Sequence, residues 1–301
     1  MSVTRSKFQR HLFPGLDEFI MNSFEELPPR YTDWANVKDS DGAFEEDMTA
    51  AGLGLFVRTP ESTNAAEDEF VPGFNKRYTH EDFTNGMGVT WQQQRDAKMI
   101  KIAGERAMDL GRAANQTIEI LVHDLLNSGF SGGPTGPDGV SLFNTSHPFY
   151  RGGGVQSNML DPVGPLTVTN YRLALTTFRR LFDHTGVRRL QMTPSGLIIP
   201  PEREYEANEI VTSAGRPDTA NRADNVSRNK TTTYVSEHLI SPNNWFMSVD
   251  KGRTKVKVWF RERFHTWDTE DERARTNWVF AAFALSYGWS DYLGWLGVNP
   301  A

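Results

Sequence analysis

One short stretch of the sequence contains the residue types of a hydrolytic active site. Ser146 and His147 are neighbours, and Asp138 and Asn144 precede them. A serine, histidine and aspartate triad hydrolyses esters and amides only where the three side chains converge in space. Adjacent side chains on an extended strand point to opposite faces, and no Gly-x-Ser-x-Gly turn is present to expose an activated serine. We therefore interpret the stretch as a turn, in which Asn144 and Thr145 cap backbone groups and His147 is extended before a proline.

Two clusters of histidine and acidic residues are candidates for a metal site. His80, Glu81 and Asp82 are contiguous, and His123 is followed by Asp124. Neither cluster has the His-x-x-x-His or His-Glu-x-x-His spacing that places two ligands on one helical face. His123 also falls near the expected C-terminus of a helix, where the helix dipole favours it without a metal. We predict no metal site, no cofactor and no catalytic residue.

The glycines around the same stretch resemble the composition of a phosphate-binding loop. No Gly-Lys-Ser/Thr ending follows them, and the run comes after a predicted helix instead of opening one. We interpret them as a connection that folds closely against its neighbours. These glycines are Gly132, Gly133, Gly136, Gly139, Gly152, Gly153 and Gly154.

The bulk composition excludes several classes of protein. The 301 residues carry a formal net charge of −6, which argues against a dedicated nucleic-acid binder. Basic residues near the N-terminus (Arg5, Lys7 and Arg10) could contact nucleic acid or an acidic partner, but a solvated helix face explains them equally well. The chain has no cysteine, so it forms no disulfide and no thiolate metal site. It has no apolar signal segment and no apolar run near the roughly 20 residues that span a bilayer.

A long helix predicted over 91–127 must position the 138–148 stretch. Thr90 and Gln93 form a capping box, and Gly129 is a stop signal. At 1.5 Å per residue such a helix is roughly 55 Å long, more than the width of a compact domain of this size. A coiled coil is one interpretation, but an alanine-rich face that stops with the helix favours a single spine against which a sheet packs. Residues on the apolar face are Met99, Ala103, Ala107, Leu110, Ala114, Ile118, Leu121 and Leu125. Residues on the polar face are Lys98, Lys101, Glu105, Asp109, Arg112, Gln116 and Glu119.

The segments before the spine have little core of their own. Residues 1–50 read as an extended arm with one short helix over 16–24, which Pro28 and Pro29 stop. Residues 51–90 read as a long hairpin-like loop, with a strand over 53–57 and a polar tip over 59–69. After the spine we predict helices over 167–183 and 202–213, strands over 196–201, 232–235, 245–249, 255–261 and 277–289, and an exposed loop over 214–232. Six of the eight tryptophans fall after residue 244, which indicates a densely packed C-terminal part.

The order of these features resembles a known family. A long helix, then Asp-Gly-x-x-Leu-Phe-Asn-Thr-x-His-Pro over 138–148, then Ser157 and Asn158, is similar to the major head subunit of tailed bacteriophages, in its Mu-like branch. Looser similarities lie in 44–54, in the Leu-Ile-Ile-Pro-Pro step over 197–201 with its following helix and Asn208, and in 267–297. The resemblance covers about residues 40–301, and only the 138–148 motif is specific.

The resemblance implies the α+β shell fold of the Hong Kong 97 type. Its parts here would be an N-terminal arm (1–50), an extended loop (51–90), a peripheral domain (91–160) with spine helix 91–127, an axial domain (161–250) and closing peripheral strands (251–301). It implies a non-enzymatic protein that assembles in the host cytoplasm into the icosahedral head of the virion. Implied partners are copies of itself in hexamers and pentamers, neighbouring capsomers through the arm and loop, a separate scaffold, the portal, decoration proteins and non-specifically bound double-stranded DNA, but no membrane.

Two other interpretations stay open at this point. The first is a soluble α+β hydrolase, or a sugar- or peptide-binding domain, that uses Ser146 and His147 or His80 and Asp82. The second is another internal or decoration protein of the same virion. Sedimentation separates the hydrolase from the shell subunit, because a shell protein sediments as large assemblies.

Overall fold

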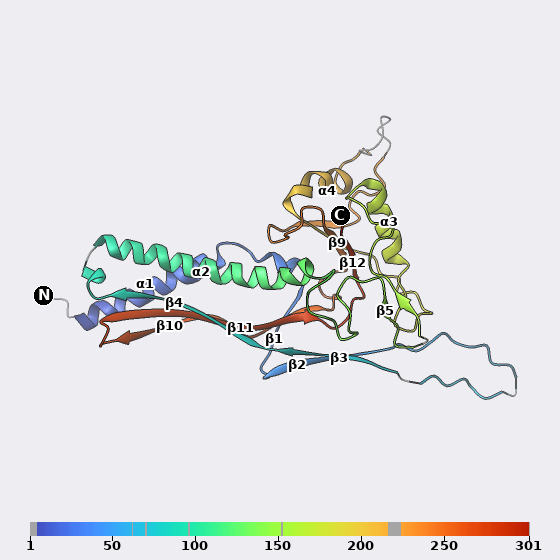
Figure 1. Cartoon of the computed structure of the whole chain (residues 1–301), viewed down its shortest axis with the longest axis horizontal. Helices are drawn as coiled ribbons and strands as arrows, with labels where there is room; N and C mark the ends of the chain where they lie inside the picture. Colours follow the sequence, from blue (N-terminus) through green and yellow to red (C-terminus); the bar gives the residue numbers. More distant parts are fainter. Residues whose placement is uncertain are drawn as a thin grey trace.

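The computed structural model describes residues 5–61, 63–69, 71–95, 97–151, 153–215 and 224–300. The subunit is elongated (Figure 1) and consists of a long body, a compact body and a two-stranded ribbon that reaches away from both. The N-terminal helix lies at one end of the long body, and the C-terminus lies in the compact body.

The long body is a four-stranded sheet covered by two helices. The sheet has the order β1-β10-β11-β4, from β1 (Asn36–Asp39), β10 (Val256–Asp271), β11 (Thr276–Trp289) and β4 (Glu81–Thr90). The β1 strand runs parallel to β10, whereas the β10–β11 and β11–β4 pairs are antiparallel. The helices α1 (Arg5–Glu25) and α2 (Ala97–Asn127) lie along one face of this sheet (Figure 1).

The spine helix is α2, and it begins later than predicted. The capping box forms, because the Thr90 N–H donates to Gln93 Oε1 (3.0 Å) and the Gln93 N–H donates to Thr90 Oγ1 (3.3 Å). It caps a short 3-10 helix, η2 (Gln93–Arg95), and the α-helix starts only at Ala97. The predicted range 91–127 was therefore six residues too long at its start. The predicted end is correct, and Gly129 lies where a side chain would overlap the Phe143 ring.

The two predicted faces of the spine are confirmed with one exception. The alanines at 103 and 107, with Leu110, Ile118 and Leu125, are buried, and Ala114 and Leu121 are half-buried. Lys101, Glu105, Asp109, Arg112 and Gln116 are exposed, but Glu119 is only 3% exposed. The side chains of Lys98 and Met99 lie outside the described part. The helix α1 packs closely against α2, since a Cβ on Gly111 would overlap the backbone of Ile20.

The N-terminal segment differs from the extended arm that was predicted. Its helix spans Arg5–Glu25 and includes Pro14, although we predicted only 16–24. The reason is tertiary packing: Leu16 and Ile20 are buried in the core shared with α2 and the sheet. A 3-10 helix, η1 (Arg30–Asp33), and β1 follow, so the segment continues into the sheet.

The ribbon is formed by β2 (Phe44–Ala50) and β3 (Pro72–Thr79), which pair antiparallel. The predicted strand over 53–57 was wrong, because those residues carry no strand pairing. The predicted loop boundaries 51–90 were also wrong. The ribbon starts at Phe44, and β4 inside the predicted loop is a strand of the long sheet, paired with β11.

The compact body is a second four-stranded sheet with two helices. Its order is β12-β9-β7-β8, from β12 (Trp295–Val298), β9 (Trp245–Ser248), β7 (Gly196–Ile199) and β8 (Thr232–Val235). The helices are α3 (Val168–Arg179), capped by Thr167, and α4 (Glu204–Val211), which follows the 3-10 helix η3 (Pro201–Arg203). Two helix predictions, 167–183 and 202–213, thus extended a few residues beyond the helices at one or both ends.

Two further corrections concern the compact body. The last strand, β12, pairs with β9 and not with the long sheet, so the chain end does not belong with the strands predicted over 251–301. The predicted exposed loop 214–232 is only partly described, since 216–223 lie outside the described residues. Its second half is not wholly exposed: Asn225 is buried and donates to the carbonyls of Ile210 (2.8 Å) and Ser213 (3.1 Å).

Candidate functional site

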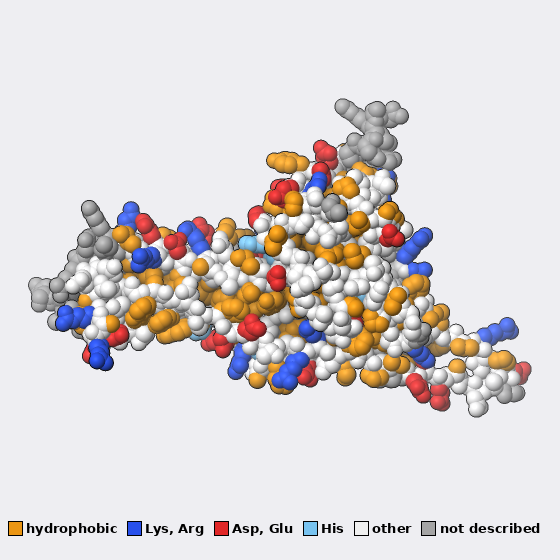
Figure 2. All heavy atoms as spheres, in the orientation of Figure 1, with side chains coloured by type: hydrophobic (Ala, Val, Ile, Leu, Met, Phe, Trp, Pro, Cys, Tyr) orange, Lys and Arg blue, Asp and Glu red, His pale blue; other side chains and the backbone are white. Residues whose placement is uncertain are grey.

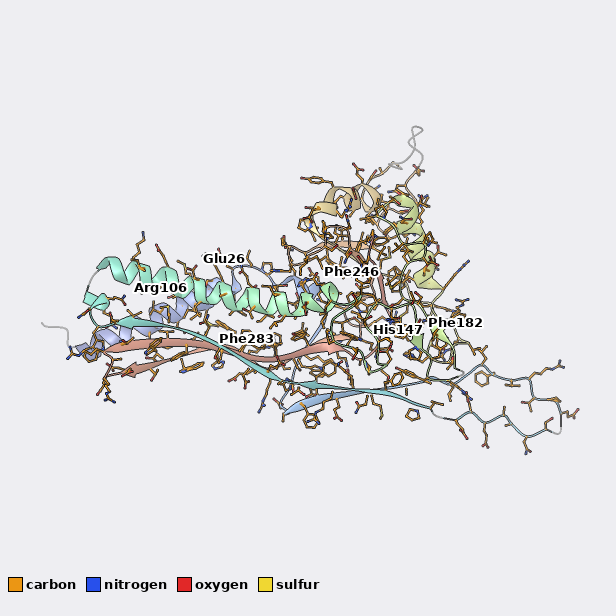
Figure 3. The ribbon with its side chains drawn as sticks, in the orientation of Figure 1. Glu26, Arg106, His147, Phe182, Phe246 and Phe283 are labelled. Carbon is orange, nitrogen blue, oxygen red and sulfur yellow. The ribbon has the colours of Figure 1, made fainter. Side chains whose placement is uncertain are left out.

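The 138–148 motif lies at the junction of the two bodies and the ribbon (Figure 3). Ser146 is exposed, whereas His147 is completely buried in the short strand β5 (His147–Pro148). The Ser146 N–H donates to Asn144 Oδ1 (2.9 Å), which is the predicted turn. The His147 ring binds Asp138 and Asn158 and not the serine. The nucleophile–base pair that a hydrolase needs is therefore not formed at these two residues.

His147 is held on both of its nitrogens. Its Nδ1 lies 2.6 Å from Asp138 Oδ2, and its Nε2 lies 3.2 Å from Asn158 Oδ1. The amide of Asn158 is oriented by donating to the Leu142 carbonyl (2.8 Å), so its Oδ1 is an acceptor. Both partners offer an acceptor oxygen, so a proton on either ring nitrogen of His147 has a partner. The ring also stacks on Tyr292, with centroids 3.8 Å apart.

A second histidine joins this junction to the ribbon. His184 Nε2 lies 2.6 Å from Asp291 Oδ2, and the His184 ring stacks on Tyr150 at 3.9 Å. The Tyr150 hydroxyl in turn bonds Thr49 Oγ1 of β2 (2.7 Å), and its ring packs edge-on against Phe74 of β3. Burial raises the pKa of the Tyr150 hydroxyl above its ordinary value, so it stays protonated at physiological pH. The end of the ribbon next to its loop is thus fixed to the compact body.

A third histidine has the connectivity of a catalytic triad. His123 Nε2 lies 2.8 Å from Ser236 Oγ, and His123 Nδ1 lies 3.2 Å from Glu119 Oε2 and 2.8 Å from the Glu119 carbonyl. Ser236 is 2% exposed, His123 is 0% exposed and Glu119 is 3% exposed. Ser236 Oγ also accepts the His238 N–H (3.3 Å). A buried hydroxyl has no route to a substrate, so this group acts as a structural connection.

The third group connects three elements. Glu119 Oε1 accepts the backbone N–H of Arg30 in η1, His123 lies on α2, and Ser236 follows β8. Burial first, and then the neighbouring His123, lower the pKa of His238, whose ring lies 5.4 Å from that of His123. We had named His123 but missed Glu119 and Ser236. The i, i+4 spacing of Glu119 and His123 was a local signal, but the serine lies 113 residues away from the histidine.

The other candidate residues are not brought together into a site. His80 Nε2 lies 3.1 Å from Ser40 Oγ, while Glu81 and Asp82 are exposed. Burial, followed by the charge of Arg261, lowers the pKa of His80. Within the described ranges, no group of three or more histidine, aspartate or glutamate side chains is placed to hold a metal ion. The side chains of Arg5, Lys7 and Arg10 lie outside the described part.

The glycines of the 132–154 segment shape turns. Gly132, Gly139 and Gly153 have φ values of +79°, +82° and +67°, which favour glycine. They follow α2 and none of them opens a helix, since α3 begins only at Val168, so the interpretation as a connection fits. In the described part of the chain, no helix is long and apolar enough to cross a membrane.

The loop between the ribbon strands carries a run of exposed apolar side chains. Leu53, Leu55 and Val57 are 62%, 61% and 70% exposed, and Phe56 is fully exposed. Figure 2 shows hydrophobic side chains on this outstretched loop, and these side chains are exposed among the described residues. An apolar surface of this kind marks a contact with another molecule.

A spine helix over a long sheet, a compact second body and an outstretched ribbon define a shell-subunit fold of the Hong Kong 97 type. The chain is similar to a solved structure of Mycobacterium phage Adephagia, with TM-score 0.58, 12% identity, and coverage of 91% of this chain and 90% of that one. It is similar to a bacteriophage JBD30 capsid decorated with minor capsid protein trimers, with TM-score 0.56, 17% identity, and coverage of 71% and 91%. A virus-like particle from Pyrococcus furiosus matches with TM-score 0.55, 11% identity, and coverage of 96% and 100%.

The family follows from the sequence. A model of the phage capsid protein family matches residues 75–298, so the chain belongs to that family. It is a structural major capsid protein of the phage head, located in the virion capsid, and not an enzyme. Its sequence has no significant match among curated proteins.

Proposed function

We propose that copies of this chain associate into hexameric and pentameric capsomers, and that the ribbon of each copy lies across a neighbouring subunit. The observation that carries the proposal is the exposed apolar loop on a rigidly held ribbon. The Tyr150 contacts fix the end of the ribbon next to the loop, and Lys257 of β10 forms an ion pair with Asp47 of β2. A firmly held ribbon with an uncovered apolar loop is suited to binding in trans, because the ribbon itself is ordered before docking.

We also propose which domain of the Hong Kong 97-type fold each part of the subunit forms. We assign the long body to the peripheral domain, the compact body to the axial domain, and residues 44–79 to the extended loop in place of 51–90. The helix α1 takes the place of an extended arm within 1–50. This division rests on the two sheets and on the ribbon pairing.

We also assign the chain to the Mu-like branch of head subunits. The support is the 138–148 motif, whose Asp138, Asn144 and His147 converge with Asn158 into one network. Because these residues depend on one another for their hydrogen bonds, together they form a specific signature of the branch. Further proposed partners are a separate scaffold, the portal, packaged double-stranded DNA and a minor capsid protein, the last because the similar JBD30 capsid is decorated with minor capsid protein trimers.

Deleting residues 59–69 tests the role of the loop. The deletion shortens the reach of the ribbon and removes the Asp68 carboxylate, which accepts the Gly54 N–H (2.6 Å) and pairs with Arg151. We expect soluble, folded subunits that do not close into shells. Gradient sedimentation and circular dichroism measure both properties. A same-length Gly/Ser replacement is the matched control, because it keeps the reach and should retain part of the assembly. Normal particles from the deletion variant would show that the loop is dispensable.

A further inference from the structure

A cavity lies where the N-terminal helix ends against the spine and the long sheet, and we name it the α1 cavity. Its volume is about 410 Å³, and small-molecule sites in proteins have volumes of roughly 300–1,000 Å³. Its walls come from α1 and the turn after it, from η1, β1 and β10, and from α2. Most of the lining side chains are apolar, and they include Phe24, Leu27, Val37, Ile118, Phe260 and Phe264. The α1 cavity therefore has the size and the lining of a site for an apolar ligand.

Contacts among the wall residues hold the α1 cavity in shape. The Asn115 side chain of α2 donates from its Nδ2 to the carbonyls of Phe24 (2.9 Å) and Leu27 (3.1 Å). The Phe24 ring stacks on Phe264 of β10, with centroids 4.3 Å apart. These contacts fix the end of α1 and the following turn to the spine and to the sheet. The cavity is therefore pre-formed, and a ligand that enters it does not have to order its walls.

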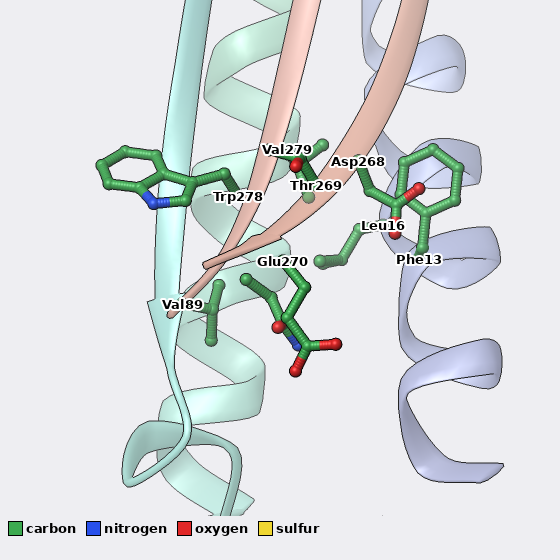
Figure 4. A pocket seen from close by; sticks show the side chains of 9 residues that line it. Phe13, Leu16, Val89, Asp268, Thr269, Glu270, Trp278 and Val279 are labelled. Carbon is green, nitrogen blue, oxygen red and sulfur yellow. The ribbon is translucent and has the colours of Figure 1, made fainter. Parts of the chain in front are cut away.

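A second hollow in the long body is much smaller. It lies between α1 and the β10–β11 hairpin, and Phe13, Leu16 and Trp278 are among the side chains that line it (Figure 4). Its volume is about 50 Å³, which is enough for only a few water molecules. The same helix thus packs more closely against the sheet around Leu16 than at its C-terminal end.

Tyr31 is a buried polar side chain in the wall of the α1 cavity. It is 5% exposed, and no hydrogen bond joins its hydroxyl to another group of the described residues. Burial, and then the charge of Glu119, raise the pKa of the Tyr31 hydroxyl to about 12, so it keeps its proton and can donate. The hydroxyl of a buried tyrosine normally has a hydrogen-bond partner. A ligand with an acceptor oxygen would supply one.

The charges at the α1 cavity do not favour a charged ligand. Glu25 and Arg263 both line it, and both are exposed. The Arg263 Nε donates to Asp39 Oδ1 (2.6 Å), and its guanidinium lies over the Phe260 ring, 4.4 Å from the centroid. Because Asp39 and Glu25 match the charge of Arg263, an anion meets no excess of positive charge. A cation would lose its hydration against apolar walls, a cost that an uncharged molecule avoids.

We propose that the α1 cavity binds one small uncharged organic molecule, with an apolar body and a carbonyl or ether oxygen that accepts from the Tyr31 hydroxyl. This binding site goes beyond the proposed assembly of capsomers and does not depend on it. The ligand joins the end of α1 and η1 to β10 and α2. It binds the folded subunit and not the unfolded chain, so it stabilises the packing of the N-terminal segment.

Titration with a fluorescent ketone tests the site. The probe is prodan, an uncharged naphthalene ketone whose emission moves to shorter wavelength in apolar surroundings. We expect a saturable blue shift with one probe bound per full-length subunit. The anionic dye 1-anilinonaphthalene-8-sulfonate is expected to bind more weakly and not to displace prodan. No saturable binding of prodan, or displacement of prodan by the anion at equal concentration, would overturn the proposal.

Removing one hydroxyl tests the hydrogen bond to the ligand. Tyr31→Phe keeps the ring and is expected to weaken prodan binding by about three- to tenfold, the range for one lost hydrogen bond. The emission of the bound probe should also shift further to the blue, because its carbonyl has lost a donor. Tyr205→Phe is the matched control, since Tyr205 is 82% exposed on α4 and does not line the cavity. Equal affinities and emission spectra for Tyr31→Phe and the control would refute the role of Tyr31.

Filling the space tests the location of the site. Val37→Phe adds a ring to the wall on β1, where an aromatic residue suits the strand. We expect it to weaken prodan binding at least about tenfold while circular dichroism shows a folded subunit. Val187→Phe is the control, because Val187 is 58% exposed and lies outside the cavity wall. Unchanged binding to folded Val37→Phe would show that the probe binds elsewhere.

Assembled particles separate a small ligand from a protein occupant. We expect particles of the full-length chain to bind prodan with the same dependence on Tyr31 as isolated subunits. Binding that is present in subunits but lost in particles would overturn the proposal, because a neighbouring copy would then fill the cavity.

Discussion

Replacing Leu110 or Ile118 of α2 with aspartate is expected to abolish soluble subunits. Both side chains are buried between the spine and the rest of the core, at 7% and 3% exposure. An unpaired carboxylate in such a place costs several kcal/mol, on the order of the whole stability of a domain, about 5–15 kcal/mol. The measurement is the yield of soluble protein, followed by denaturant unfolding of any soluble fraction.

The opposite face of the same helix provides the matched controls. Gln116 is exposed, and Arg112 forms an ion pair with Glu26 (2.9 Å) in which both side chains are about half exposed. Exposed ion pairs contribute roughly 0–1 kcal/mol, so Arg112→Ala and Gln116→Ala are expected to be mild. Equal damage from the two sets of substitutions would refute the assignment of the faces.

Removing the acidic partner of His147 has the second large expected effect. Asp138→Ala leaves the buried Nδ1 of His147 without its hydrogen-bond partner, and an unsatisfied buried polar group costs about 1–3 kcal/mol. We expect a lower denaturant midpoint and loss of assembly, since the motif joins the two bodies and the ribbon. Chemical denaturation of purified subunits measures the first effect, and particle yield measures the second.

The adjacent serine is the control for this substitution. Ser146 is exposed, and its hydroxyl contacts only Thr145 Oγ1 (3.4 Å) among the hydrogen bonds of the described residues. Ser146→Ala is therefore expected to leave both stability and particle yield almost unchanged. If Asp138→Ala were as mild as Ser146→Ala, the His147 network would not hold the junction together.

The elements that depend on local periodicity could be predicted from the sequence. The faces of α2 follow from apolar residues at three- and four-residue steps, and Gly129 predicted the helix end. Glu119 was misplaced because its position belongs to the polar face, but η1 folds over it and its Oε1 accepts the Arg30 N–H. The start of α1 was missed because the helix continues through Pro14, held by packing that no local pattern reveals.

The elements that depend on distant pairing could not be predicted in this way. The β2 strand alternates exposed and half-buried residues of mixed polarity, so its pairing with β3 has no apolar signature. The β12 strand joins β9 across about fifty residues, and no propensity tells one sheet from the other. Pairing between strands that are far apart in the sequence depends on the whole fold.

The candidate site also combines residues that are close in the sequence with residues that are close only in space. Asp138, Asn144, His147 and Asn158 lie within 21 residues, so the motif and the Asn158 that follows it can be recognised in the sequence. The ring of Tyr292, which stacks on His147, comes from the far end of the chain. The Glu119–His123–Ser236 connection was missed for the same reason. A single sequence shows neighbours along the chain, whereas these contacts are neighbours only in space.

The most direct test of the central claim is electron microscopy of the purified full-length chain across a range of concentrations. We expect capsomer rings and closed, regularly sized shells, formed without an added cofactor. A folded protein that stays dispersed as single subunits at every concentration, also when its candidate scaffold is co-expressed, would contradict the claim that this chain builds the head shell.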